Sequence, residues 1–583
     1  MDKQNLDDLR HSCAHLLAAA VLDIYPDAKR TIGPAIEDGF YYDFDFGTKK
    51  ISEDSFSRIE QKMHELVKKW GKFEMTELSI KEAAELFKDN EYKEELIKGI
   101  VEKKEKITVY KSGEFSDLCR GDHVVHPRGD LKYFKLLSIA GAYWRGDEKN
   151  KMLTRIYGTV FPTKDELEKY LWQHEEAKKR DHKKLGPQLD FFHFQSEAPG
   201  MPFWHPKGMI LRNILLEFSR RIQAGYQYKE VQAPNLLDVE IFKKSGHWDH
   251  YKDNMFFAEG WGDKLFALRP MDCPGTIQIY KFTPKSYKDL PLRFSEYGTV
   301  TRNEKSGELN GLFRVAQITQ DDAHIFARPD QIKDVVKETM KLAEEIYKVF
   351  KIPYKVYLST RPDDYMGELE TWERAEQSLK AAMKEQGIPM LVKEKDGAFY
   401  GPKIDYQLED SLGRTWQCGT IQLDFQMPSV FDLNYTGEDG KDHRPVIIHR
   451  TIMGSIERFI GILMEHHAAS FPFWLSPVQA VILPISEKFQ DYAIKVKEDL
   501  EKNSIRVELN NDSKPLGAKI RHSTLQKIPF MIIIGEKELQ KNVGAQFIAP
   551  TMVTVRTRSG KDLGMLEVNK FIDQLKSQIE NFS

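Results

Sequence analysis

The stretch that decides the fold reads His449-Arg450-Thr451-Ile452-Met453-Gly454-Ser455-Ile456-Glu457-Arg458. A polar segment runs here into an apolar helix, which suits a ligand site better than a packed core. Two further polar motifs hold Cys273 (residues 271–275, Met-Asp-Cys-Pro-Gly) and His324 (residues 319–324, Thr-Gln-Asp-Asp-Ala-His). With His449 they make three ligands for a tetrahedral Zn²⁺ and leave its fourth position open, as in catalytic rather than structural sites. Taken singly, a Cys or His is more often a packed or surface residue, so the prediction depends on the motifs.

Several other motifs follow one another along the chain. They are residues 225–234 after an amphipathic helix, 300–304 (Val-Thr-Arg-Asn-Glu), 311–315 (Gly-Leu-Phe-Arg-Val), 416–425 and 454–459. The first resembles motif 1 of the class II aminoacyl-tRNA synthetases, the next two resemble motif 2, and the last resembles motif 3. With residues 319–324 and 416–425, the set is similar to the threonyl-tRNA synthetase family. The resemblance runs from about residue 5 to the C-terminus, with every block in the expected order.

Size and composition agree with a large enzyme of several domains. A chain of 583 residues is too long for one core, and none of its apolar runs is long enough to cross a bilayer. The polar N-terminus argues against a signal peptide, and four cysteines do not suggest a disulfide framework. We therefore expect a cytoplasmic protein with no membrane partner. The net charge of −3 gives no general signal for nucleic acid; DNA is not expected, and any RNA contact must come from local patches.

The resemblance implies a multidomain α+β fold. We expect an editing domain of α+β type at residues 1–161, a linker helix at 162–185, a class II catalytic domain at 186–475 and an anticodon-binding domain at 477–583. The catalytic domain should hold an antiparallel sheet flanked by helices, and the last domain an α/β fold with a mostly parallel sheet. The chain has no glycine-rich phosphate loop, so side chains must hold ATP. It is also expected to lack the small domain that family members often carry before the editing domain.

The N-terminal segment carries a second set of ligand-type residues. His11 and His15 are four residues apart, and so share one face of a helix, and the same spacing separates Cys119 from His123. These four residues suit a structural zinc site. The resemblance implies instead a metal-free hydrolytic editing pocket, lined also by Lys93 and Asp117. The adjacent Asp122 stands where the family usually has proline.

The resemblance also assigns residues to ATP, which would be bound with Mg²⁺. Arg302 would contact the α-phosphate, Glu304 the adenine amino group, and Arg314 and Arg458 the γ-phosphate. Arginine suits such contacts because its planar fork stays charged and bonds two oxygens at once. Lesser candidates around the adenylate are Lys403, Gln417, Thr420 and Ser455; of these, Lys403 is grouped with Arg302 and Arg458 as catalytic.

The predicted zinc explains the choice of amino acid. An apolar pocket separates threonine from valine only about a hundredfold, whereas a site that demands a hydroxyl reaches about 10⁴ to 10⁵. By resemblance, the threonine pocket is completed by Gln320, Asp322, Tyr400 and Gln422. Serine keeps the hydroxyl, so a second, hydrolytic site is expected. Beside Cys273, Asp272 and Thr276 replace the Asn and His of many family members, and we expect altered bonding around the ion rather than its loss.

The remaining expectations concern tRNA and subunits. The resemblance implies that Glu538 and Arg556 meet anticodon bases, that the strand after residue 225 lies at a homodimer interface, and that tRNA(Thr) is the partner. The stretch 539–552 is longer than the turn usual in the family. The basic run 178–184 would be either a tRNA contact or a solvated helix end. Two alternatives to an editing synthetase are a non-enzymatic RNA-binding relative and a free-standing hydrolase of mischarged tRNA; the first predicts lost arginines or zinc ligands, and none is missing.

Overall fold

The computed structural model describes residues 3–260, 262, 264–540 and 551–582. The chain forms two compact units, Met1–Glu175 and Glu176–Ser583. Within the described residues, none of the helices is both long and apolar enough to span a bilayer. Each unit has its own apolar core, so each is described by itself below.

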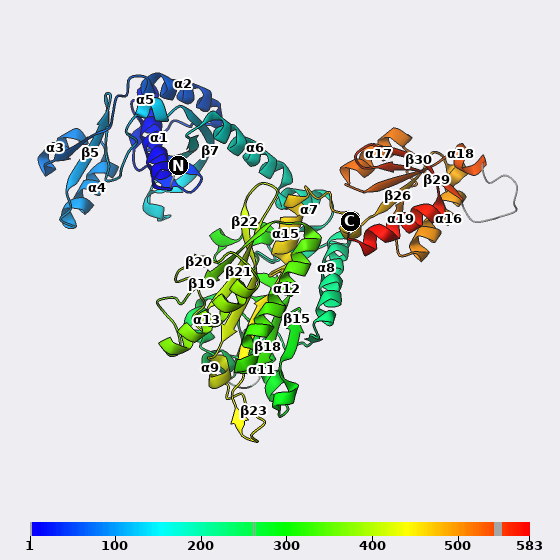
Figure 1. Ribbon diagram of the computed structural model, residues 1–583. Helices are drawn as coiled ribbons and strands as arrows, with labels where there is room; N and C mark the ends of the chain where they lie inside the picture. The colour runs from blue at the N-terminus through cyan, green and yellow to red at the C-terminus, as the bar shows by residue number, and fades with distance from the viewer. Residues whose placement is uncertain (1–2, 261, 263, 541–550, 583) are drawn as a thin grey trace. The chain divides into compact units, whose positions relative to one another are not determined.

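The first unit is built around helix α1 (Lys3–Ile24), whose apolar face is buried against a sheet (Figure 1). The sheet has the order β1 (Lys29–Arg30), β3 (Gly39–Asp45), β8 (Met152–Phe161), β7 (Tyr133–Tyr143), with β2 (Ala35–Ile36) paired to β3. A smaller sheet has the order β4 (Glu74–Leu78), β5 (Ile107–Ser112), β6 (Phe115–Leu118), beside α3 (Ile80–Leu86) and α4 (Glu91–Glu102). Helix α1 and strand β6 thus belong to the same compact unit although they lie far apart in the sequence.

The second unit contains an eight-stranded sheet. Its order is β11 (Lys229–Glu230), β15 (Leu292–Glu296), β18 (Asp322–Ala327), β25 (Val446–Thr451), β22 (Thr415–Asp424), β21 (Lys403–Glu409), β19 (Tyr354–Ser359), β20 (Leu391–Lys393). All neighbours from β15 to β19 are antiparallel, and only the two edge strands pair in parallel. Helices α12 (Ile332–Phe350) and α13 (Leu369–Glu385) bury apolar faces in the core beside this sheet (Figure 1). The expected antiparallel sheet flanked by helices is confirmed.

The last part of the chain forms a five-stranded sheet. Its order is β27 (Val507–Leu509), β26 (Ala480–Pro484), β28 (Phe530–Ile534), β29 (Met552–Thr557), β30 (Asp562–Glu567). The helices beside it are α16 (Gln490–Lys502), α17 (Leu516–Leu525) and α19 (Val568–Glu580). The first three strands are parallel and the last two are antiparallel, so the expectation of a mostly parallel sheet is wrong. The cause is β29, which pairs antiparallel to β28, together with β30, which the sequence pattern does not reveal and which returns antiparallel to β29.

The single charged helix expected over 162–185 is divided. The structure has α6 (Lys164–Arg180) and α7 (His182–Gln188). Between them Asp181 accepts a hydrogen bond from the backbone N–H of Lys183 and so begins a new helix. The charge pattern runs through this break, which is why periodicity alone does not show it. The helix expected over 208–224 is observed as α8 (Pro206–Gly225).

Candidate functional site

Three elements of the second unit bring Cys273, His324 and His449 together. Cys273 is the first residue of α11 (Cys273–Lys281), while His324 and His449 lie directly opposite each other on β18 and β25. One sulfur and two nitrogen ligand atoms lie within 4.8 Å of one another. All three side chains are buried. The structure thus assembles the metal-ligand set that the motifs predict.

The surroundings fit a metal ion. Both ring nitrogens of His324 are buried without a hydrogen-bond partner among the described residues. His449 is held through Nε2, which lies 3.0 Å from Oδ2 of the buried Asp424. Burial raises the pKa of the Cys273 thiol and lowers the pKa of His324, because burial disfavours the charged form of each group. An orphaned imidazole beside a thiol and a second imidazole is a donor set suited to a metal ion.

The three ligand residues line a cavity of about 390 Å³. Most of the residues assigned to threonine and to the adenylate share this cavity: Arg302, Gln320, Asp322, Tyr400, Lys403, Thr420 and Gln422. Tyr400 donates a 3.0 Å hydrogen bond to Oε1 of Gln422, which fixes both side chains. Burial raises the pKa of Asp322 to about 7. The cavity therefore has the volume of a small-molecule site and combines polar with apolar lining groups.

A tight turn places Tyr400. Ala398 and Gly401 form a short antiparallel bridge around it, and Gly401 lies against the backbone of β22. A Cβ atom at Gly401 would come within 1.9 Å of the carbonyl oxygen of Leu423. Only glycine fits this position, because that oxygen belongs to the backbone and cannot move aside.

Two arginines from separate motifs are held by backbone carbonyls, and of the two Arg302 lines the cavity. Arg302 follows β16 (Thr299–Thr301), and its Nε donates a 3.1 Å hydrogen bond to the carbonyl of Pro270. Arg458 lies in α15 (Ile456–His466), and its Nε donates to the carbonyl of Phe313 at 2.9 Å. Its Nη1 lies 3.2 Å from the carbonyl of Gln417. Both guanidinium groups are thus oriented by backbone carbonyls and keep further N–H groups for a ligand.

Glu304 and Arg314, expected on adenine and on the γ-phosphate, bond to each other. Arg314 Nη2 lies 2.7 Å from Oε2 of Glu304 and 2.7 Å from Oε2 of Glu308. The Arg314 side chain is 45% exposed, so the pair is accessible to solvent. A nucleotide could bind Glu304 and Arg314 as expected only after the ion pair between these two side chains opens.

Sequence reasoning missed two buried carboxylates that organise the site. Asp405 accepts hydrogen bonds from Gln417 (2.7 Å) and Thr420 (3.0 Å), and its other oxygen lies 3.1 Å from Nζ of Lys403. Asp321 accepts hydrogen bonds from three successive backbone N–H groups, 452 to 454, just before α15. Asp405 alternates with apolar residues like the other polar residues of β21, so the sequence gives no signal that this carboxylate is buried with partners.

A histidine was also missed. His247 is buried, with Nε2 3.7 Å from Sγ of Cys273 and Nδ1 2.7 Å from the hydroxyl of Ser245. Its pKa is lowered to about 3 by burial, so it is neutral at pH 7. His247 is the first residue of α10 (His247–Tyr251), and the polar stretch around it matches none of the motifs described above.

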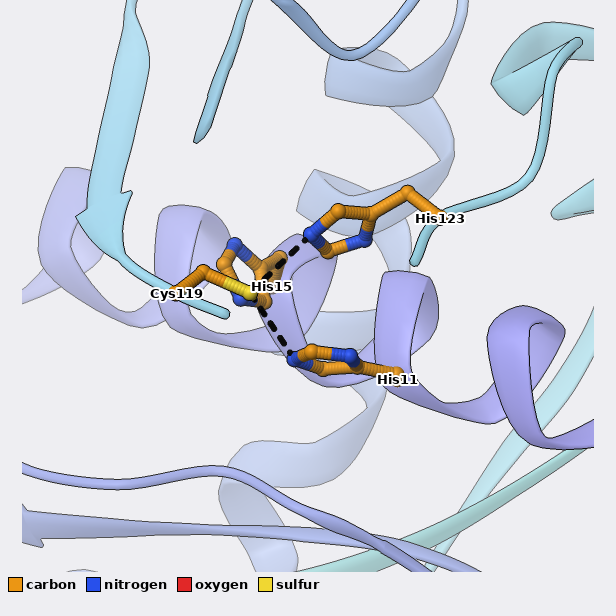
Figure 2. A group of neighbouring side chains, drawn as sticks. All are labelled: His11, His15, Cys119 and His123. Atoms are coloured by element: carbon orange, nitrogen blue, oxygen red, sulfur yellow. Dashed lines mark hydrogen bonds between the residues drawn. The ribbon is translucent and has the colours of Figure 1, made fainter. Parts of the chain in front are cut away.

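The first unit assembles the other predicted set. His11 and His15 project from α1, and Cys119 and His123 lie in the segment that follows β6, so that the four side chains converge (Figure 2). Sγ of Cys119 lies 3.3 Å from Nε2 of His11 and 3.3 Å from Nε2 of His123. Burial lowers the pKa of His15 to about 3 and that of His123 to about 2, and raises that of Cys119 to about 11. Four uncharged ligand atoms within 4.8 Å of one another suit a metal ion as well as a hydrolytic pocket.

Lys93 and Asp117 join the same cavity, which measures about 860 Å³. They form a buried ion pair of 2.7 Å, and Arg30 Nε lies 3.2 Å from the same Asp117 oxygen. The hydroxyl of Tyr42 bonds to the second oxygen of Asp117. Asp122, the departure from the family pattern, is exposed and lines the mouth of this cavity.

The residues expected at the anticodon lie on α18 (Glu536–Gln540) and β29. Glu538 is 4% exposed and accepts hydrogen bonds from the backbone N–H of Gly535 (2.7 Å) and from the hydroxyl of Thr554. Arg556 is half-buried on β29. Of the long stretch at 539–552, residues 541–550 lie outside the described residues. Glu538 therefore makes hydrogen bonds within its own domain, to Gly535 and Thr554.

Comparison with known protein families agrees with this architecture. Residues 257–467 match the tRNA synthetase class II core domain (G, H, P, S and T). Residues 479–578 match an anticodon binding domain, and residues 107–157 match the threonyl and alanyl tRNA synthetase second additional domain. The fold and site are those of a class II aminoacyl-tRNA synthetase.

Comparison with individual relatives identifies the family within this class. The chain is 51% identical over 571 residues to a threonine–tRNA ligase of Caldanaerobacter subterraneus, covering 98% of this chain and 87% of the relative. It is 51% identical over 582 residues to that of Acetivibrio thermocellus, covering 100% and 90%. A crystal structure of the RNA binding domain of threonyl-tRNA synthetase from Cryptosporidium parvum is 40% identical with a TM-score of 0.65, covering 68% of this chain and 98% of that one. The chain belongs to the threonyl-tRNA synthetase family.

Proposed function

We propose that the protein joins threonine to tRNA(Thr) and hydrolyses seryl-tRNA(Thr) made in error. One observation carries the first activity: the Cys273, His324 and His449 set opens on the same small cavity as Arg302. An amino-acid carboxylate oxygen attacks the α-phosphorus of ATP, and pyrophosphate leaves. A hydroxyl at the 3′ end of the tRNA then attacks the carbonyl carbon of the threonyl-adenylate, and AMP leaves.

The arginines and Lys403 neutralise phosphate charge in the first step. Such chemistry needs positioning and charge stabilisation more than covalent catalysis. Arg302 would hold the α-phosphate, with Lys403 beside it in the cavity. Arg314 and Arg458 would hold the γ-phosphate end together with Mg²⁺, and Glu304 would accept from the adenine amino group once its pair with Arg314 opens.

The threonine side of the cavity provides selectivity. A zinc ion held by Cys273, His324 and His449 would supply an open position for the amino nitrogen and the hydroxyl of threonine. Asp322, Gln320 and the bonded pair of Tyr400 and Gln422 would receive and orient the same polar groups. Valine leaves such a site with unpaired polar groups, which disfavours it by about 10⁴-fold or more.

Serine would be accepted by this site because it has the hydroxyl. The seryl-tRNA(Thr) formed from it would then be hydrolysed in the first unit. We assign the hydrolysis of its ester to the cavity lined by His11, His15, Lys93, Asp117 and Cys119, with His123 beside Cys119. Three neutral imidazoles and the buried Lys93–Asp117 pair are suited to hold a water molecule and an ester group in one place. In this proposal the cluster works without a metal, so the protein holds one zinc per chain rather than two.

The remaining assignments follow the same proposal. Residues 1–161 edit, 162–185 link, 186–475 activate and transfer threonine, and 477–583 bind the anticodon, with Glu538 and Arg556 near its bases. The exposed edge strand β11 supports pairing with a second copy of the chain, which sedimentation would detect as two 67.7 kDa subunits. The four free cysteines agree with a reducing cytoplasm.

ATP–pyrophosphate exchange tests the proposal directly. We expect exchange with threonine, weaker exchange with serine and none with valine. Seryl-tRNA(Thr) supplied to the protein should be hydrolysed while threonyl-tRNA(Thr) survives. Exchange with valine equal to that with threonine would contradict the zinc assignment. Absence of all exchange would favour the two alternatives, an RNA-binding relative or a free-standing hydrolase, which the seryl-tRNA assay separates.

A further inference from the structure

His182, the first residue of α7, is a buried histidine that the proposed reaction does not use. Its side chain is fully buried and lies between two motifs of the ATP site. On one side is the turn Gly311–Phe313, and on the other is Glu465 near the end of α15. A Cβ atom at Gly311 would come within 2.3 Å of Nε2 of His182, so the ring and the turn are in close contact.

The hydrogen bonds define the state of the ring. The backbone N–H of Leu312 donates to Nε2 at 2.9 Å, so Nε2 carries no proton. Nδ1 therefore carries the proton and donates to Oε1 of Glu465 at 2.6 Å. Burial alone would raise the pKa of Glu465, but bonds from His182 and Arg414 lower it, so the carboxylate is ionised. Both ring nitrogens are occupied, which argues against a metal ion at Asp181, His182 and Glu465, although their ligand atoms are close together.

The 311–313 turn bonded to His182 is connected to two arginines assigned to ATP. The carbonyl of Phe313 accepts the 2.9 Å hydrogen bond from Nε of Arg458, and Arg314 follows directly in the chain. The Phe313 ring stacks on Trp416 with centroids 4.1 Å apart and lies 4.3 Å from the His182 ring. A shift of this turn would therefore move two arginines that the proposed function places on ATP phosphates.

We propose that His182 is a positioning residue for ATP, which fixes the 311–313 turn through its bond to the Leu312 amide. The inference rests on the proposed function, because it takes Arg314 and Arg458 as phosphate ligands. His182 acts through the turn and touches no substrate. Its loss leaves a buried N–H group without an acceptor, which is enough to displace the turn.

Two amide replacements separate the two bonds of the ring. His182→Gln places an oxygen where Nε2 lies and keeps the acceptor for Leu312, whereas His182→Asn keeps only a donor toward Glu465. We expect KM for ATP in threonine-dependent exchange to rise about tenfold in His182→Asn and His182→Ala. In His182→Gln it should rise less than about threefold. KM for threonine should stay within about twofold in all three.

The control is His205→Asn. His205 also bonds a carboxylate through Nδ1, at 2.5 Å from Asp190, and its other nitrogen bonds His193; neither bond involves the 311–313 turn or the arginines assigned to ATP. Direct measurement of the ATP dissociation constant by equilibrium dialysis repeats the comparison without any aminoacylation, so it stands even if the proposed amino acid is wrong. The inference is overturned if Gln behaves like Ala, if no variant changes ATP affinity, or if ATP and threonine parameters worsen together with Tm.

Discussion

His324 and His449 face each other across two neighbouring antiparallel strands, with ring centroids 4.7 Å apart and ring planes at 77°. Strand pairing fixes their separation, because opposite residues of adjacent strands project to the same face. The third ligand, Cys273, comes from the first turn of a separate helix. Two ligands are thus held by the sheet itself, and the cavity beside them keeps a defined shape before any substrate arrives.

Replacing Cys273 by alanine should remove the zinc and, with it, the preference for threonine over valine. We expect zinc content to fall from about one per chain to below about 0.1, because two imidazoles alone do not complete a three-ligand site. Elemental analysis measures the ion independently of activity.

Cys13→Ala is the matched control for this experiment, since Cys13 is an equally buried free cysteine in α1 of the other unit. It should keep both the zinc and the exchange activity. Full zinc occupancy in Cys273→Ala would contradict the assignment of the metal site.

Mutations in the first-unit pocket should slow hydrolysis of seryl-tRNA(Thr) without affecting threonine charging. Cys119→Ala and His15→Ala should accumulate seryl-tRNA(Thr), with deacylation slowed by about 100-fold or more, while threonine charging stays within about twofold. The reason is that both residues lie in the first unit and neither lines the cavity assigned to ATP and threonine. His64→Gln, at an exposed position of the same unit, should deacylate normally. Equal loss of charging and deacylation would argue against two sites.

Asp405→Asn should impair activation although Asp405 contacts no substrate in the proposed mechanism. Its carboxylate holds Lys403, Gln417 and Thr420, and an amide would accept from fewer of them and lose the ion pair with Lys403. We expect kcat/KM for ATP to fall by about 10- to 100-fold in pyrophosphate exchange. Asp432→Asn, an exposed aspartate that pairs with Arg444, should behave as wild type. An unchanged rate in Asp405→Asn would show that these three side chains are held by other contacts.

The buried ion pair of Lys93 and Asp117 should make the stability of the first unit depend on acid pH. Burial by itself would raise the pKa of Asp117, but the charges of Lys93 and Arg30 lower it from 3.8 to about 2. A depressed carboxyl pKa stabilises the folded state above about pH 4, and this contribution is lost as pH falls through about 2.

Asp117→Asn should cost about 3–5 kcal/mol at pH 7, because Lys93 remains buried without its partner. Urea unfolding followed by hydrogen exchange of α1 and β3 measures this loss for the first unit alone. Between pH 4 and pH 2 the difference from wild type should shrink. Asp27→Asn, whose aspartate is exposed and pairs with Lys49, should change neither value. A difference that stays constant over this range would mean that Asp117 has the same pKa in the folded and unfolded states.

The convergence of both His/Cys clusters could be predicted from the sequence, but the buried groups that support them could not. Cys273, His324 and His449 stand in polar motifs, and four-residue spacing relates His11 to His15, so their types and places indicate a site directly. Asp321 stands in the polar motif 319–324 and Asp405 in an alternating polar strand, so nothing in the sequence distinguishes them, and their role appears only when strand pairing brings donors to them. The pairing of Glu304 with Arg314 could not be foreseen either, because it depends on which charges approach each other without a nucleotide. Likewise, the break at Asp181 depends on packing around His182 rather than on charge periodicity.

The backbone contact at Gly401 limits how the amino-acid preference could be re-engineered. A library that varies Tyr400 and Gln422 to admit other substrates must keep glycine at 401, because any side chain there would push the turn off β22 by way of the Leu423 carbonyl. Substitutions of the side chains that face the cavity can therefore change the substrate range, whereas the backbone of the loop that holds Tyr400 tolerates almost no substitution at 401. Selection experiments should recover diversity at 400 and 422 and a single residue at 401.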